Sequence, residues 1–158
     1  MHYNNKPNRF PVIFSYVDGF SVGGSAINDV DISFSNSIVG KSNPRSKPYQ
    51  GDRVLVTGKT NDGIYIFAAQ VNHHVENSST NVWANQGGLQ WNYNYNITPL
   101  SKPTTMTWDD IDRITMSSKS QDKRIFHDRF RPQNDGTRIT EVGLSRDRLF
   151  NHLVKNHQ

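Results

Sequence analysis

The sequence of 158 residues contains no cysteine. A disulfide scaffold, a thiolate nucleophile and a zinc site built on cysteine are therefore excluded. No apolar run approaches the roughly 18 residues that span a bilayer. The first ten residues, MHYNNKPNRF, lack the apolar core of a signal peptide. We expect a cytoplasmic protein with no membrane-spanning segment.

Apolar and charged residues are also scarce, at 34% and 20% of the chain, and asparagine, with 17 copies, fills much of the gap. The core must then depend on the aromatic residues, which make up 11% of the chain, because each large ring buries roughly 150–250 Å². The length suits one domain. We expect residues 1–9 to form a flexible N-terminus and residues 10–158 a single domain.

Charge is distributed unevenly along the chain. Residues 1–112 carry 8 basic and 9 acidic side chains, a net charge of −1, whereas residues 113–158 carry 10 basic and 5 acidic ones, a net charge of +5. A basic C-terminal third favours a polyanionic partner, most simply nucleic acid, either DNA or RNA. The alternative is that a charge of this size only keeps the protein in solution.

Hydrophobic patterning predicts strands and loops in the first fifty residues. Residues 10–17 are β-branched and aromatic, which is typical of a buried strand. Residues 19–30 contain three glycines and predict a loop, and residues 30–39 alternate in part between apolar and polar, which predicts a weaker strand. Residues 40–50, with two prolines and three cations, predict an exposed loop.

The clearest local pattern is a hairpin. Two strands, residues 53–57 and 64–71, flank Asn61-Asp62-Gly63, and Asp-Gly supplies the positive φ angles of a tight turn. Residues 89–97 alternate asparagine with large side chains and predict a further strand that ends at Pro99. One face of that strand would carry Trp91, Tyr93, Tyr95 and Ile97.

Two helices are predicted in the C-terminal part. Thr107 caps a short helix that begins at Trp108. Residues 137–142 predict a strand, and Ser145 then caps a final helix. The apolar face of this helix would consist of Leu149, Phe150, Leu153 and Val154. The predicted fold is α+β: a small mixed β-barrel of five or six strands, with one short helix and a C-terminal helix packed on it.

Motifs for catalysis, metals and cofactors are missing. The sequence has no GxSxG elbow, no HExxH and no GxGxxG loop between a strand and a helix. The histidines at 73, 74, 127, 152 and 157 show no ligand spacing. We therefore expect no catalytic residue, metal or cofactor.

Aromatic and amide side chains favour recognition of a base. Trp83, Trp91, Tyr93 and Tyr95 fall within 13 positions and are flanked by asparagines. Rings stack on bases, and amides match the donor and acceptor pattern of a base edge. The alternative is that the strand tyrosines belong to the core. In residues 119–131, five cations are interleaved with two phenylalanines, which suits a phosphate backbone, unless the phenylalanines pack into the core.

A series of short motifs, in order along the chain, resembles the PUA-like superfamily. Within it the closest likeness is to the EVE domain, a relative of YTH and ASCH domains. The motifs are Pro11–Val17, Tyr49-Gln50-Gly51-Asp52-Arg53-Val54-Leu55-Val56, Tyr65–Val71, Asn81-Val82-Trp83, Tyr95–Leu100 and Gly143-Leu144-Ser145-Arg146. The resemblance implies a β-barrel with an aromatic pocket for a flipped or modified base. Ser15 and Tyr16 would contact the base edge, and Trp83 and the loop at Gly19-Phe20-Ser21 would border the pocket.

We therefore predict a non-catalytic domain that binds nucleic acid and recognises a base, plain or modified. The base-pocket candidates are Ser15, Tyr16, Phe20, Ser21, Trp83 and Trp91, and the phosphate candidates are Arg45, Lys47, Lys102, Arg124, Arg129 and Arg131. The alternatives are an OB-like barrel that binds single strands without base preference, and a phage or mobile-element factor that binds a protein. An enzyme is a further alternative, which a recessed histidine beside a carboxylate would indicate. A protein partner could supply catalysis.

Overall fold

The computed structural model describes residues 8–16, 24–41, 50–75, 93–116 and 136–158. Its elements, in chain order, are β1 (Val12–Tyr16), α1 (Ala26–Asn36), β2 (Ile38–Lys41), β3 (Arg53–Lys59), β4 (Gly63–Val75), β5 (Tyr93–Pro99), β6 (Thr104–Thr107), α2 (Trp108–Thr115) and α4 (Gly136–Asn156). Within the described residues, no helix combines the length and apolar character that a membrane span requires.

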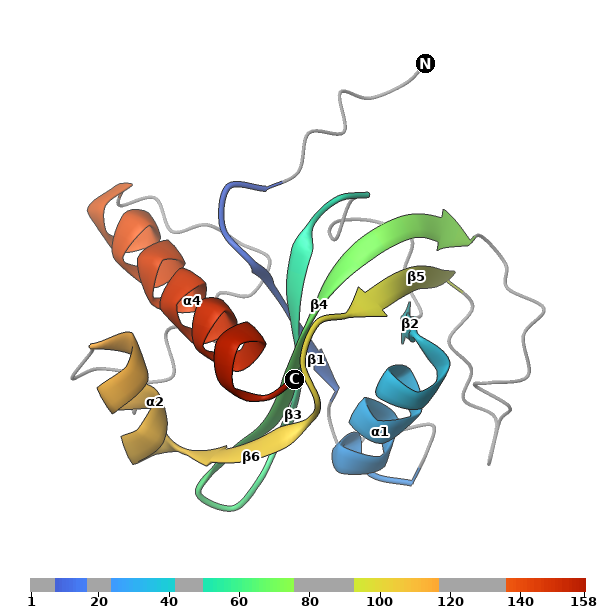
Figure 1. The fold of residues 1–158 in the computed structure, drawn as a ribbon, viewed down its shortest axis with the longest axis horizontal. Coiled ribbons are helices and arrows are strands. Elements are labelled where there is room, and N and C mark those ends of the chain that lie inside the picture. Colours follow the sequence, from blue (N-terminus) through green and yellow to red (C-terminus); the bar gives the residue numbers. More distant parts are fainter. Residues whose placement is uncertain (1–7, 17–23, 42–49, 76–92, 117–135) are drawn as a thin grey trace.

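The six strands form one mixed sheet in the order β1-β3-β4-β5-β2, with β6 paired to β4. β1 runs parallel to β3, and every other pairing is antiparallel. The long strand β4 carries β6 beside its first residues and β5 beside its last, so that the sheet turns around it and curls into a half-barrel (Figure 1). The prediction of an α+β fold with a curled mixed sheet is confirmed.

The predicted hairpin forms between β3 and β4. The backbone N–H of Thr60 donates to the carbonyl of Gly63 at 3.0 Å, closing the turn. Gly63 also allows β6 to pass close by, because a Cβ at this position would overlap the backbone carbonyl of Met106. The hairpin is confirmed, but the positive φ angles predicted for Asp62-Gly63 are wrong, since neither residue has one. The glycine instead provides room for β6, a strand that was not predicted.

Helix α1 replaces the predicted loop and strand over residues 26–36, and those two predictions are wrong. The Ser25 side chain accepts a hydrogen bond from the backbone N–H of Asn28 at 3.1 Å, which caps the helix. The buried side of the helix consists of Ala26, Asp29, Val30 and Ser33, at regular helical spacing. Because two of these four residues are polar, the periodicity of hydropathy does not reveal the helix.

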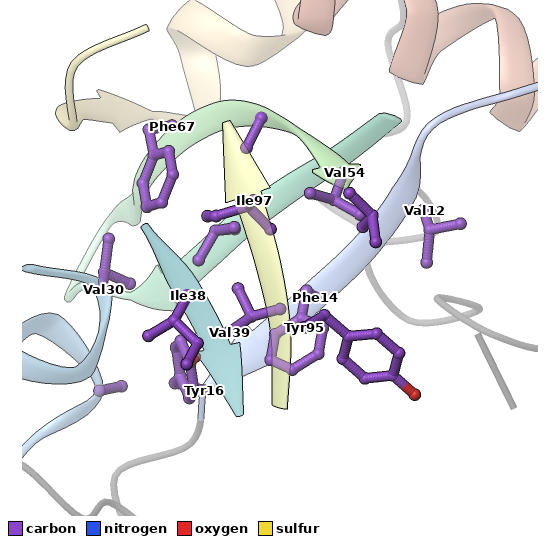
Figure 2. Close-up of a cluster of buried hydrophobic side chains, with 14 residues drawn as sticks. Val12, Phe14, Tyr16, Val30, Ile38, Val39, Val54, Phe67, Tyr95 and Ile97 are labelled. Carbon is purple, nitrogen blue, oxygen red and sulfur yellow. The ribbon is translucent and has the colours of Figure 1, made fainter. Parts of the chain in front are cut away.

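Alternate residues of the strands build two cores on opposite faces of the sheet. One core faces α1 and holds Phe14, Tyr16, Val56, Phe67 and Tyr95, several of which are labelled in Figure 2. The other faces α2 and α4; its members from the strands and α2 are Ile13, Leu55, Ile64, Ile66, Ala68, Met106 and Ile111, and those from α4 are Leu149, Phe150 and Leu153. Figure 1 shows α1 on one side of the sheet and α2 and α4 on the other. We call these sides the α1 face and the α2/α4 face.

The short helix α2 forms as predicted. Thr107 accepts from the N–H of Asp110 at 3.1 Å, and the Asp110 carboxylate accepts from the N–H of Thr107 at 3.2 Å, which completes a capping box. The final helix differs from its prediction. α4 begins at Gly136, so the predicted strand at 137–142 and the predicted cap at Ser145 are wrong. The predicted apolar face at its C-terminal end is confirmed, with Leu149 and Leu153 fully buried.

The segment before β1 holds α4 against β3. The ring of Phe10 fills the space where a side chain of Gly143 would stand. The Arg53 guanidinium donates to the carbonyl of Arg9 at 2.8 Å and pairs with the Asp147 carboxylate at 2.9 Å. The fully buried carboxylate of Asp52 accepts two hydrogen bonds from Asn8, at 2.6 and 2.7 Å. We call these contacts the N-terminal clasp.

Candidate nucleic-acid interface

The structure places the two described base-pocket candidates on different faces of the sheet. Ser15 and Tyr16 are neighbours in β1, and successive side chains of a strand point to opposite faces. Tyr16 lies in the core of the α1 face, whereas Ser15 shares the α2/α4 face with Ile13. The two residues therefore do not line one pocket on a single face.

Tyr16 is buried, and its hydroxyl group has interior partners. It shares a hydrogen bond of 2.6 Å with the Ser33 hydroxyl and accepts from the backbone N–H of Gly40 at 3.3 Å. Burial raises the pKa of the phenol above its ordinary value of 10, and the nearby Asp29 carboxylate raises it further. The phenol is therefore neutral at physiological pH and links β1, α1 and β2.

Ser15 is only partly buried, near the carboxyl end of β1. Its hydroxyl lies 2.9 Å from the hydroxyl of Thr57, its register partner in β3. These are polar groups at the end of an otherwise apolar face. They provide hydrogen-bonding capacity at the strand end where the predicted pocket begins.

One polar contact at this end of the sheet was not predicted from the sequence. The partly buried Tyr65 donates a hydrogen bond of 2.6 Å to the carboxylate of Asp31 on α1. Desolvation and this hydrogen bond raise the pKa of Tyr65 to about 12. Tyr65 lies opposite Gly58 in the hairpin, and a Cβ at Gly58 would stand 2.9 Å from the carbonyl oxygen of Ala26. The absence of a side chain at Gly58 thus allows the first turn of α1 to pack directly on the sheet beside Tyr65.

Most of the other predicted site residues lie outside the described residues. These are the base-pocket candidates Phe20, Ser21, Trp83 and Trp91 and the phosphate candidates Arg45, Lys47, Arg124, Arg129 and Arg131. Their roles remain predictions. Tyr95, one of the four aromatic residues between positions 83 and 95, is a core residue with 4% of its surface exposed. The alternative that a strand tyrosine belongs to the core is confirmed for this residue.

The remaining phosphate candidate, Lys102, lies beside the end of α4. Its side chain is exposed, and its backbone N–H donates to the carbonyl of His157 at 2.6 Å. Lys102 lies between β5 and β6, and the other basic side chains on this side come from α2, from α4 and from the residues that follow α4. We call this group the C-terminal cationic edge; it comprises Lys102, Arg113, Arg148, His152, Lys155 and His157.

Helical spacing and contacts between elements bring the members of this edge together. Arg148 and Lys155 are exposed on α4 and lie two turns apart, about 10 Å along the axis. Arg148 donates to the carbonyl of Thr115, the last residue of α2, at 3.0 Å. The rings of His152 and His157 have centroids 5.7 Å apart.

The acidic residues of α2 limit the positive charge of this edge. Arg113 pairs with Asp110 at 2.8 Å, and this hydrogen bond holds the pKa of the carboxyl below its ordinary value. Asp109 and Asp112 lie on the same helix. The basic character is therefore strongest along α4 and at the end of the chain that follows it, away from the first turn of α2.

The described residues contain no cluster of three or more histidine, aspartate or glutamate side chains with the geometry to hold a metal ion. No protein-family model matches the sequence, and a search of curated proteins finds no relative. The fold and the side chains themselves are therefore the basis for assigning a function.

Proposed function

We propose that this protein is a non-catalytic nucleic-acid-binding domain that recognises a base, plain or modified. The observation that carries the proposal is the C-terminal cationic edge. Three segments of the chain supply cationic or hydrogen-bond-donating side chains to one surface there. Such a surface suits a phosphate backbone, because phosphate contacts come mainly from arginine, lysine and other side-chain donors.

The proposal includes a PUA-like fold and a base pocket at the carboxyl ends of β1 and β3. The curled mixed sheet is compatible with that fold. On the α1 face, Tyr65 supplies a partly buried ring and a hydroxyl group beside the start of α1, whereas Ser15 lies on the opposite face and is not assigned to this pocket. Aromatic rings and hydroxyl groups are the groups that hold an unstacked base. Trp83 is the residue that we assign to stacking.

The test is fluorescence polarisation with labelled single- and double-stranded DNA and RNA, each with plain and modified bases, at two salt concentrations. We expect binding that weakens steeply with salt, because phosphate contacts release condensed counterions. Lys155→Glu should raise Kd about tenfold for every probe and reduce the salt slope by about one. The Trp83→Ala variant should lose the preference for one base.

Arg9→Glu is the matched control. Arg9 is exposed, lies before the amino end of β1 and outside the cationic edge, and undergoes the same change of charge. We expect a Kd within about twofold of the wild type, since this position makes no phosphate contact. If the two charge reversals raise Kd equally, the cationic edge contributes only through the net charge of the protein. Binding without base preference would favour the OB-like alternative, and absence of binding to every probe would refute the proposal and favour a protein partner.

A further inference from the structure

Two histidines of the cationic edge lie side by side with their rings tilted, and hydrogen bonds hold the backbone at both positions. His157 follows α4, and its N–H donates to the carbonyl of Leu153 at 2.9 Å while its own carbonyl accepts from Lys102 at 2.6 Å. The side-chain amide of Asn156 donates to the carbonyl of His152 at 3.0 Å and lies 3.3 Å from its Nδ1 atom. The ring centroids stand 5.7 Å apart at an angle of 52°. The fold therefore holds the two backbone positions that carry these rings.

The neighbouring charges that act on the pKa of His152 are positive. Desolvation lowers the pKa of His152, and the neighbouring His157 and then Arg113 lower it further. Arg148 and Lys155 lie one turn before and one turn after on α4, and Lys102 adjoins His157. The facing carboxylate of α2, Asp110, is occupied by Arg113 at 2.8 Å, and Asp112 lies on the same helix. Protonation of either ring therefore adds a cation to a cationic surface.

We propose that His152 and His157, with Arg113 beside them, form a phosphate-binding site whose affinity rises as the two imidazoles take up protons. The site rests on the proposed function, since the phosphate belongs to a nucleic acid. Neutral histidine donates one hydrogen bond and accepts at its other nitrogen, whereas protonated histidine donates from both. A phosphate beside two protonated rings accepts charge-assisted hydrogen bonds from them, and its negative charge offsets the repulsion between the two rings.

Binding and proton uptake are then linked. An anion at the site favours the protonated form of both rings, so binding at neutral pH takes up protons and affinity increases toward lower pH. Between pH 8.0 and pH 5.5 we expect Kd for an oligonucleotide to fall by at least about tenfold, because one linked proton gives about a factor of ten per pH unit near its titration. Phosphodiesters do not titrate in this range, so the change originates in the protein.

The experiment measures Kd of a labelled oligonucleotide with a 5′-hydroxyl end from pH 5.5 to pH 8.0. The wild type is compared with the double variant His152→Gln/His157→Gln, in which neither side chain can become charged. We expect the Kd of the double variant to lose the decrease toward low pH and to change by less than about twofold between pH 8.0 and pH 5.5. Lys155→Gln is the control. It should raise Kd by a similar factor at every pH, because lysine stays charged throughout.

A second oligonucleotide with a 5′-phosphate distinguishes the two sources of a phosphate group. Tightening at low pH only for that probe would assign the site to a terminal phosphate, and tightening for both would assign it to the backbone. A wild type that binds with the same pH dependence as the double variant would overturn the site while leaving the proposed function standing.

Histidine NMR titrations in sodium sulfate and sodium chloride of matched ionic strength test the site even if no oligonucleotide binds, which would be the failure of the proposed function. Sulfate carries no titratable proton between pH 5.5 and pH 8.0. A rise in the pKa of both rings in sulfate supports the anion site. Equal values in the two salts refute it.

Discussion

The two faces of the sheet are packed in different ways. The core of the α2/α4 face is mainly aliphatic, although it includes Phe150 and the buried hydroxyl group of Thr115, and it is closed by helix–helix and helix–sheet packing. The α1 face contains more aromatic rings and also the buried polar groups of Tyr16, Asp29 and Ser33. The edge of each face also differs in charge, since α1 carries two aspartates and no cation whereas α4 carries the exposed Arg148 and Lys155.

This difference indicates what each face depends on. An aliphatic core is stabilised by volume and close packing, so that its sensitivity lies in cavities. A core with buried hydroxyl and carboxyl groups depends in addition on the partners of those groups, since an unsatisfied buried group costs free energy. The two faces should therefore respond differently to substitutions that remove carbon atoms and to those that remove a single oxygen.

The largest effect is expected on the α2/α4 face. Leu153 is fully buried between α4 and the sheet, and Leu153→Ala should lower the free energy of unfolding by about 2–5 kcal/mol, because it leaves a cavity. Urea unfolding followed by circular dichroism measures this. Leu144→Ala on the exposed side of the same helix is the control and should cost less than about 1 kcal/mol. Equal losses at the two positions would contradict the assignment of this face.

Removal of one oxygen tests the α1 face. Tyr16→Phe retains the ring but leaves the buried Ser33 hydroxyl and the N–H of Gly40 without this partner. We expect a loss of about 1–3 kcal/mol in the free energy of unfolding. The double variant Tyr16→Phe/Ser33→Ala should cost less than the sum of the single variants, because both partners are then apolar. Strict additivity in urea unfolding would show that the pair is not coupled.

The N-terminal clasp joins the segment before β1 to the α2/α4 face. Its contribution can be tested with a substitution that should destabilise the protein in one background and stabilise it in another. Gly143→Ala places a methyl group where the Phe10 ring lies, and we expect a destabilisation of about 1–3 kcal/mol from overpacking. In a Phe10→Ala background the same substitution should stabilise by up to about 1 kcal/mol, since alanine favours a helix over glycine. Thermal unfolding of the four proteins measures both values. The same sign in both backgrounds would contradict the contact.

The smallest effect concerns the rim of the α1 face. The pKa of Tyr65 is raised to about 12, so the folded state retains this proton where the unfolded state loses it. The stability that Tyr65 contributes is therefore fully present below pH 10 and is lost as pH rises from about 10 through 12. Tyr65→Phe should reduce this loss, as measured by urea midpoints at pH 9 and pH 11. If the variant and the wild type lose the same stability between pH 9 and pH 11, the contact with Asp31 does not retain the phenol proton of Tyr65.

The sequence predicts those elements whose local signals agree with their surroundings. The hairpin at Asp62-Gly63 and the cap at Thr107 depend on residues within a few positions, and both predictions are confirmed. Helix α1 was missed because Asp29 and Ser33 occupy its buried stripe. The start of α4 was misplaced because Gly143 is typical of a helix boundary, whereas here the glycine makes room for a ring from a segment distant in the sequence.

The candidate site was predicted less well for the same physical reason. Residue type identified Tyr16 as a group able to contact a base, but only the sheet register shows that its hydroxyl is taken by α1 and β2. The pairing of His152 with His157 follows from the way the chain leaves α4, and their spacing in sequence gives no ligand motif. Arg113 joins them only through the packing of α2 beside α4.

The N-terminal clasp and the cover of the α2/α4 face have a consequence for the order in which the protein folds on the ribosome. β1 and β3 leave the ribosome early and expose Ile13 and Leu55 on one face. The residues that cover this face, Leu149 and Leu153, are translated more than ninety residues later. Contacts of such long range form slowly. Throughout that interval the nascent sheet offers an uncovered aliphatic surface. During synthesis this surface should therefore be prone to aggregation until α4 can pack on it.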